Sequence, residues 1–363
     1  MPLRYQRRAL AFMRMRLMRA LRSARTLFAV GSLLSALAAA APNDGKLLTD
    51  VVFTHYSAYA GNAELARRLL SPATVAQIER QMAASGQKLT GQAIDLSAER
   101  FSVYVPNQAP AHGYGLLVFV PPWQQASLPQ GWAPVLDQYG VIFVTAARSG
   151  NSENTMGRRE PLALLAAYNV MAAYPIDADR VYIGGFSGGS RIAQRLAIGY
   201  PDLFRGAVLN AGSDALGDMT AEPPIPLPPR DLFMRFQSDT HLIYVTGEHD
   251  EDRVRQDRSS IHSMSEWCVF TTEGIVEPLL GHTVAQPAAL ARALAGLRAA
   301  PQPDAGKLSR CRADMDADLD AKLAKVESLI ADGQRAAADK LLRKIDERYG
   351  GLAAPRSLKL AQH

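Results

Sequence analysis

Between residues 114 and 273 the apolar residues occur in continuous runs rather than in alternation with polar ones. Six runs predict strands: YGLLVFVPP, GVIFVTAA, RVYIGGF, GAVLNAG, HLIYVTGE and WCVFTTE. Unbroken apolar strands are typical of a parallel sheet that helices cover on both faces. Helical patterns separate several of them, namely EPLALLAAYNVMAAY and GSRIAQRLAIGY, and a third, QPAALARALAGL, follows the last. The pattern predicts an α/β fold with a doubly wound, mostly parallel sheet that binds ligands at the carboxyl ends of its strands.

Residues 42–100 are predicted to form an N-terminal extension that packs on this core. They combine a strand-like start, VVFTHYSAY, with helical stretches around residues 64–70 and 72–84. RFSVYVP follows, and its alternation of apolar and more polar residues indicates a half-buried strand. We therefore place the main domain at residues 101–303.

Two segments depart from the strand–helix rhythm. Residues 213–240 are proline-dense and longer than an ordinary connection, which predicts a cap at the catalytic edge; a stiff surface loop is the alternative. Residues 304–363 are predicted to form a C-terminal helical hairpin whose two amphipathic helices join near Asp332 and Gly333. The hairpin resembles one tetratricopeptide-type helix pair. One repeat cannot build the usual binding groove, so we expect a brace for the main domain, with protein contact as the other role.

The excess of positive charge is concentrated at the start of the chain. The 363 residues carry a formal net charge of +5, but residues 1–40 hold eight arginines and no acid, so the remainder carries −3 and nucleic-acid binding is not expected. The arginine-rich start, the apolar run LFAVGSLLSALAAAA and the small residues Ala38 and Ala40 predict a signal peptide at residues 1–41. An uncleaved anchor helix is the alternative, but the run is shorter than the roughly 20 apolar residues of a membrane span. We expect a secreted or periplasmic protein.

The chain contains two cysteines, Cys268 and Cys311. In an oxidising compartment an even count permits one disulfide, which would join the end of the main domain to the segment after it. Two unrelated buried thiols are the alternative.

A serine among glycines lies between a predicted strand and a predicted helix. GFSGG, from Gly185 to Gly189, matches the G-x-S-x-G nucleophile elbow, with RVYI before it and SRIAQRLAIGY after it. The short pattern also occurs by chance, so its strand and helix context is what makes it informative. In that context the Ser187 hydroxyl stands clear of the sheet, and the Gly188 N–H at the helix N-terminus can point at an oxyanion.

A serine hydroxyl needs a base that is oriented by a carboxylate, and in this fold the order is serine, acid, histidine. HLIYVTGEHDED supplies the acid; Asp250 is preferred, with Glu248 and Asp252 as alternatives. LLGHTVAQ supplies the base, His282, directly ahead of a predicted helix. The other histidines are His55, His112, His241, His249, His262 and His363. His249 lies among acids, but no second histidine has a ligand spacing, so a metal site is not expected.

The second oxyanion donor should follow the first core strand. That strand ends in LLVFVPPWQQ, and because Pro121 and Pro122 have no N–H, the donor is predicted to be Trp123, with Gln124 as a weaker alternative. The alternative is that Trp123 is simply an aromatic residue at the rim of the site.

With these residues, the chain from about 101 to 300 resembles the α/β-hydrolase superfamily. It is nearest to serine esterases of the polyhydroxybutyrate-depolymerase and feruloyl-esterase kind, and more distantly similar to prolyl-oligopeptidase-like peptidases. The segments IDADRVYIGGFSGGSRIAQRLAIGYPDLFRGAVLNAG and LLGHTVAQPAALARAL carry the likeness. The resemblance implies a Ser187, His282 and Asp250 triad, an acyl-enzyme route and no cofactor.

The first hypothesis is therefore an exported serine hydrolase that cleaves carboxylic esters. Aromatic residues expected near the mouth, Trp123, Trp132 and Phe186, favour an apolar acyl group or a polymer fragment. The second hypothesis is a non-catalytic binding protein on the same scaffold, because one fold hosts many functions. The third is an aminopeptidase, although the roughly 50 residues between the leader and the first core strands leave no room for a propeller.

Overall fold

The computed structural model describes residues 45–92, 94–299 and 302–362. The predicted signal peptide at residues 1–41 lies outside these ranges, so its assignment stays a prediction. Within the described ranges, no helix has both the length and the apolar character needed to cross a membrane.

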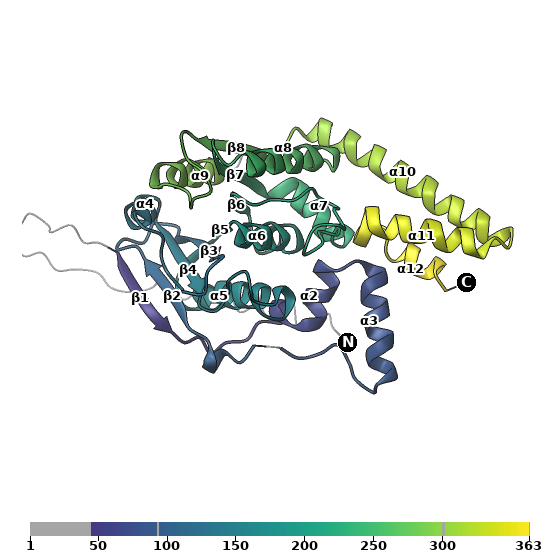
Figure 1. Ribbon diagram of the computed structural model, residues 1–363, viewed down its shortest axis with the longest axis horizontal. Helices are drawn as coiled ribbons and strands as arrows, with labels where there is room; N and C mark the ends of the chain where they lie inside the picture. The colour runs from purple at the N-terminus through teal and green to yellow at the C-terminus, as the bar shows by residue number, and fades with distance from the viewer. Residues whose placement is uncertain (1–44, 93, 300–301, 363) are drawn as a thin grey trace, which may run out of the picture. The chain divides into compact units, whose positions relative to one another are not determined.

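Within the described residues, eight strands form one sheet in the order β1-β2-β4-β3-β5-β6-β7-β8 (Figure 1). The strands are β1 (Lys46–Val51), β2 (Phe101–Val105), β3 (Tyr114–Val120), β4 (Val141–Ala146), β5 (Ile176–Phe186), β6 (Gly206–Asn210), β7 (His241–Gly247) and β8 (Thr272–Glu277). β1 and β4 each pair antiparallel with β2, and the other pairs are parallel. Every residue of β3, β4, β6 and β7 is buried, as unbroken apolar runs require. The predicted doubly wound, mostly parallel sheet is confirmed.

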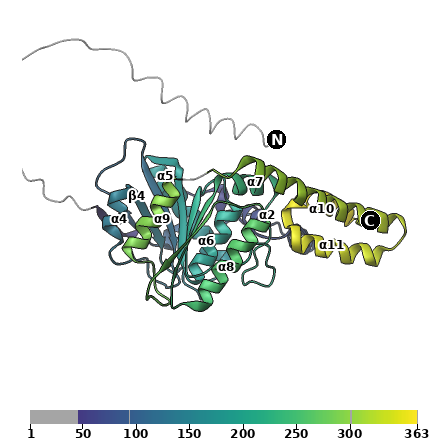
Figure 2. The same ribbon diagram turned by 90° about the horizontal axis from the view of Figure 1, so that it is seen from above.

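Helices cover both faces of the sheet (Figure 2). α5 (Glu160–Ala173), α6 (Gly188–Gly199) and α8 (Glu251–Glu266) pack on one face, and α4 (Trp132–Tyr139) and α9 (Pro287–Ala299) on the other. α5, α6 and α9 form where the sequence predicts helices. α4 and α8 were not expected: α4 buries Trp132, Val135 and Leu136 at helical spacing but is only eight residues long, and α8 is mostly polar.

Two predicted strands are placed differently. In WCVFTTE the strand begins only at Thr272, because Trp267 still caps the end of α8 and Cys268 takes a left-handed φ of 63° that breaks an extended run. In VVFTHYSAY only the first residue belongs to β1, which starts earlier, at Lys46. The chain then leaves the sheet, since the Phe53 ring packs on Phe101 and the His55 N–H donates to the Asn169 side chain at 3.1 Å.

The proline-dense segment is part loop and part helix. Residues 213–229 carry no regular element, but Arg230–Asp239 form α7, whose Phe233 and Phe236 are fully buried. Pro229 is the N-cap residue of α7, where no backbone N–H is needed for a hydrogen bond within the helix, so a proline is tolerated there. The run of prolines therefore ends where the helix begins. The predicted insertion, residues 213–240, thus contains an irregular segment followed by α7, and its role as a cap stays a prediction. Arg195 of α6 donates to the Pro224 carbonyl and holds this segment against the main domain.

The remaining helices of the described chain are α2 (Asn62–Leu69), α3 (Pro72–Ala84), α10 (Ala305–Ala331), α11 (Arg335–Tyr349) and α12 (Arg356–Leu360). It also has short 3₁₀ helices η1 (Ala58–Ala60), η2 (Leu96–Ala98) and η4 (Gly350–Leu352) and a short π-helix η3 (Thr155–Arg159).

The segments at the two ends of the described chain contact each other. α10 and α11 pack along each other, and the turn between them contains Asp332 and Gly333, as predicted (Figure 1). Asp346 of α11 accepts from the Ser71 hydroxyl at 2.5 Å and from the Ala73 N–H at 3.0 Å, at the start of α3.

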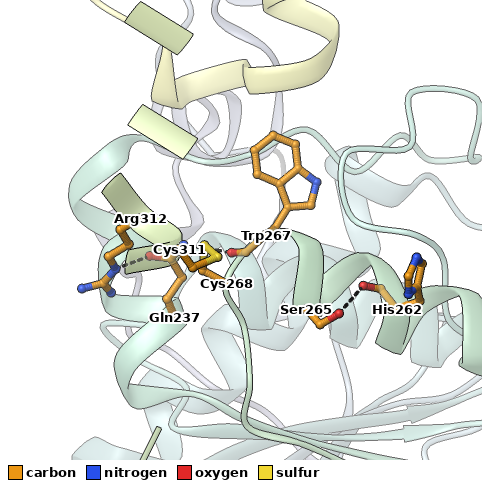
Figure 3. The surroundings of a disulfide bond; sticks show 7 residues. All are labelled: Gln237, His262, Ser265, Trp267, Cys268, Cys311 and Arg312. Atoms are coloured by element: carbon orange, nitrogen blue, oxygen red, sulfur yellow. Dashed lines mark hydrogen bonds between the residues drawn. A yellow bond between two sulfur atoms is a disulfide. The ribbon is translucent and has the colours of Figure 1, made fainter. Parts of the chain in front are cut away.

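A disulfide joins Cys268, after α8, to Cys311 in α10 (Figure 3). Beside it, Arg312 donates to the Gln237 side chain of α7 at 2.6 Å, and Gln237 donates to the Trp267 carbonyl at 2.9 Å. Of the two alternatives for the cysteines, the structure has the bridge. It anchors the first turns of α10 to the main domain.

Candidate active site

Ser187 occupies the turn between β5 and α6. Its φ of 55° and ψ of −123° lie outside the regions that L-residues prefer, which costs about 1 to 3 kcal/mol. The Ser187 N–H donates to the Asn210 carbonyl at the end of β6 at 2.8 Å, so the neighbouring strand holds the strained turn. The expected strand–serine–helix arrangement is present.

Close packing explains the glycines on either side of this serine. A Cβ on Gly185 would lie 2.4 Å from the backbone of Gly189, and a Cβ on Gly189 would lie 1.9 Å from the Val120 carbonyl oxygen. Such contacts are far inside van der Waals range and involve backbone that cannot rotate away. Only glycine at these positions lets α6 start so close to β3 and β5.

The structure brings His282 and Asp250 to this serine from two later loops. His282 lies between β8 and α9, and its Nε2 is 2.9 Å from the Ser187 hydroxyl oxygen. Its Nδ1 is 2.5 Å from Asp250 Oδ2. Asp250 is the N-cap residue of α8 but makes no capping bond, because its side chain is turned to the imidazole instead. The Phe186 ring lies 4.9 Å from the imidazole and packs along it.

The alternative acids lie elsewhere. Glu248 accepts from the Leu279 N–H at 3.0 Å, and Asp252 is exposed and pairs with Arg255. Among the described residues, no three His, Cys, Asp or Glu side chains are grouped as a metal site would need.

The two predicted oxyanion donors lie on either side of the turn. Gly188 is the first residue of α6, so its N–H has no acceptor within the helix. The Pro122 carbonyl accepts from the Asn151 N–H at 3.0 Å, and since the N–H and C=O of a trans peptide point in opposite directions, the Trp123 N–H points away from Asn151. In the part of the chain that the structure describes, neither N–H donates to a backbone acceptor. The Trp123 ring packs 6.3 Å from both Phe119 and Phe186.

The sheet order and the strand–Ser187–helix turn decide the fold. The chain has the α/β-hydrolase fold. No protein-family description matches its sequence, and no curated protein does either. Among solved structures it is similar to an S-formylglutathione hydrolase from Staphylococcus aureus, with 11% identity over 55% of this chain and 92% of the other and a TM-score of 0.43. A poly(3-hydroxybutyrate) depolymerase from Bordetella parapertussis has 18% identity over 59% and 88%, with a TM-score of 0.39. A ferulic acid esterase has 14% identity over 54% and 89%, with a TM-score of 0.40.

Two residues of this hydrolase fold that the sequence did not single out fix the loops of the site. Asn210 is 1% exposed, and its side chain donates to the Val245 carbonyl at 2.8 Å and accepts from the Ala285 N–H at 2.7 Å. It thereby ties β6 and β7 to the loop that carries His282. The only sequence signal is a polar residue at the end of an apolar strand run.

Asp257 is the second. Its carboxylate accepts from the hydroxyls of Ser213, at 2.6 Å, and Thr246, which follow β6 and lie in β7. Burial, and to a smaller extent the nearby Asp250 carboxylate, raise the pKa of Asp257. This acid therefore joins the strand ends beneath the Asp250 turn rather than reaching the imidazole.

A cavity of about 710 Å³ opens beside Ser187 and Gly188. Its other described lining residues are Asn151, Asn154, Thr155, Met156, Arg159, Arg191, Glu222, Pro223, Pro224 and Arg253. None of the three aromatic residues expected at the mouth is part of this described lining. Phe186 is 9% exposed and packs on His282, and Trp123 packs on Phe119 and Phe186. Trp132 is 1% exposed, packs in the core against Phe119 and Phe143, and donates its indole N–H to the Ala285 carbonyl at 2.9 Å. It supports the His282 loop from beneath and does not line the cavity.

Proposed function

We propose that the protein is a serine hydrolase that cleaves carboxylic esters through an acyl-enzyme. The observation that carries the proposal is the chain of contacts from Ser187 through both nitrogens of His282 to Asp250. A serine alone is a poor nucleophile near neutral pH, and this arrangement supplies the base it needs.

In the proposed reaction Ser187 attacks the ester carbonyl as His282 Nε2 takes its proton. The carbonyl oxygen becomes an oxyanion, which the N–H groups of Gly188 and Trp123 stabilise. Asp250 keeps the proton of the neutral imidazole on Nδ1 and stabilises the imidazolium. His282 then protonates the leaving alkoxide, and a water molecule, activated by the same imidazole, hydrolyses the acyl-enzyme.

Two measurements on the same variants test this. Wild-type protein should hydrolyse a short 4-nitrophenyl ester and be labelled by a fluorophosphonate, which reacts only with an activated serine. Ser187→Ala should lose both properties and keep the unfolding curve of the wild type. Ser265→Ala removes an exposed serine of α8 and serves as the matched control. A folded wild type that is neither labelled nor active would favour the non-catalytic binding protein, and hydrolysis of amino-acid amides in preference to esters would favour the peptidase.

Export is part of the proposal. It is supported by the arginine-rich and apolar pattern of residues 1–41 and is compatible with the Cys268–Cys311 disulfide, a bond typical of oxidising compartments. Expression with the native leader, followed by mass spectrometry of the N-terminus, should find mature protein that begins near residue 42 outside the cytoplasm. Protein that keeps residues 1–41 in the membrane fraction would favour the anchor instead.

A further inference from the structure

The cavity beside Ser187 is lined by more positive than negative charge. Its described lining includes Arg159 from η3, Arg191 from α6 and Arg253 from α8, against a single acid, Glu222. Three separate elements thus bring guanidinium groups to one hollow next to the proposed nucleophile. A cavity for a purely apolar acyl chain would not need them, since burying charges is costly unless they are paired.

Arg159 is the most deeply placed of the three. It is 4% exposed, and its Nε and Nη2 donate to the carbonyls of Ser149, at 2.9 Å, and Pro121, at 3.0 Å. Within the described ranges it forms no ion pair, because the neighbouring Glu160 and Glu153 pair with Arg195 and Arg158. Burial lowers the pKa of Arg159 to about 10, which marks a cation without a matching anion. Its Nη1 makes no hydrogen bond to the described residues.

The other two arginines also keep unused donors. Arg191 pairs with Asp214 through Nη2, but its Nε is buried without a hydrogen-bond partner in the described structure. Arg253 donates through Nη1 to the Gln256 side chain at 2.6 Å and forms no ion pair within the described residues. Asp214, which pairs with Arg191, and Asp257, which accepts from two hydroxyls, also act electrostatically on Arg253, but among the described residues no carboxylate is hydrogen-bonded to Arg159 or Arg253.

We propose that this cavity binds a negatively charged group of the substrate, so that esters with a carboxylate near the scissile bond are preferred over neutral ones. This inference rests on the proposed ester hydrolysis. Guanidinium groups match a carboxylate in shape and charge and form charge-assisted hydrogen bonds with it. Gly188 and Ser187 belong to the same cavity lining, so the anion subsite lies next to the proposed oxyanion position. A substrate held at Ser187 would therefore place a nearby carboxylate in this subsite.

Matched pairs of esters test the proposal at low ionic strength. In one pair the charge is on the acyl side: the mono-4-nitrophenyl ester of glutaric acid and its primary amide. In the other it is on the leaving group: 4-acetoxybenzoate and 4-acetoxybenzamide. In wild-type protein the ratio of kcat/KM for the carboxylate to that for the amide should be about 10 or more in at least one pair, as a charge-assisted hydrogen bond predicts. A ratio of 1 or below in both pairs overturns the proposal.

Arginine variants show whether the cavity causes the preference. Arg159→Gln should reduce the ratio to about 1. Since Arg159 also holds the Ser149 and Pro121 carbonyls, Arg253→Gln repeats the test without touching that turn and should reduce the ratio several-fold. Arg258→Gln removes the same charge from an exposed position of α8 outside the cavity lining and should leave the ratio unchanged. A preference that survives both cavity variants, or that is equally lost in Arg258→Gln, contradicts the assignment.

Direct binding separates this proposal from the proposed hydrolysis. Calorimetry on Ser187→Ala with the two glutarate esters needs no turnover. Binding that is about tenfold tighter for the carboxylate, and that disappears when Arg159→Gln is added, supports the anion subsite even if no ester is cleaved. If the fluorophosphonate labels wild-type Ser187 but Ser187→Ala binds the carboxylate and the amide equally, the anion subsite is refuted. The proposed hydrolase activity would still be supported.

Discussion

Replacing Asp250 with asparagine is the sharpest test of the proposed triad. The two side chains have the same shape, and Asp250 makes no capping bond to α8, so the substitution removes no helix cap. It removes the charge that lies 2.5 Å from His282 Nδ1. Fold stability should therefore change little while the chemistry changes strongly.

The expected size of the loss follows from the geometry. An imidazolium and a carboxylate whose charge centres lie about 4 Å apart interact by about 4 kcal/mol at the effective dielectric constant of about 20 that suits partly exposed groups. This value is appropriate here because the His282 side chain is 40% exposed and that of Asp250 is 12% exposed. At about 1.4 kcal/mol for each factor of ten, the loss in kcat is about 10³-fold. An amide that donates to Nδ1 also favours the tautomer with the proton on Nε2, which cannot accept from Ser187, so the loss extends to about 10⁴-fold.

The assay is steady-state hydrolysis of a 4-nitrophenyl ester near neutral pH, with thermal unfolding measured on the same samples. Asp252→Asn is the matched control, since it removes an exposed carboxylate two residues along the same turn. Glu248→Gln tests the remaining alternative. Full activity in Asp250→Asn, or an equal loss in Asp252→Asn, would refute the role of Asp250.

Three further predictions concern stability. Gly189→Ala should destabilise the protein by about 3 kcal/mol or more in chemical denaturation, because its Cβ meets the carbonyl at the end of β3, whereas Gly281→Ala adds a Cβ in open space and should be tolerated; equal effects would contradict the packing argument. Replacing Cys268 and Cys311 with alanine opens a link across 43 residues and should lower the free energy of unfolding by about 4 kcal/mol, which reduction of the wild type should reproduce. Two neighbouring arginines lower the pKa of Glu64 to about 2, so its contribution is present above its ordinary pKa and is lost as the pH falls from about 4.5 to 2. Glu64→Gln should therefore be less stable than wild type at pH 7, by about 1 to 2 kcal/mol for this partly exposed side chain, with no difference near pH 2 in urea denaturation.

The strands of the sheet centre were predictable because burial on both faces leaves a direct mark on sequence. β3, β4, β6 and β7 coincide with apolar runs, and every residue in them is buried. α8 left no such mark. Its buried residues are Asp257, Ser260, Ser263 and Met264, most of them polar and held by side-chain hydrogen bonds that only the folded chain creates.

The proposed catalytic residues were also predictable as types and in order, since the strand–serine–helix motif is local. The choice among Glu248, Asp250 and Asp252 was not local. Three acids within five residues differ in sequence only by position, and the path of the turn after β7 decides which one faces His282.

The sequence by itself determined the layered α/β architecture, the strained turn at Ser187 and the helical hairpin, because each depends on short-range periodicity or on glycines close in the chain. Tertiary structure alone decided what surrounds that serine. Arg159, Arg191 and Arg253 come from three elements that are distant in sequence, and Trp132, expected at the mouth, is buried beneath the His282 loop. Long-range packing sets which side chains share a cavity, and no local pattern records it.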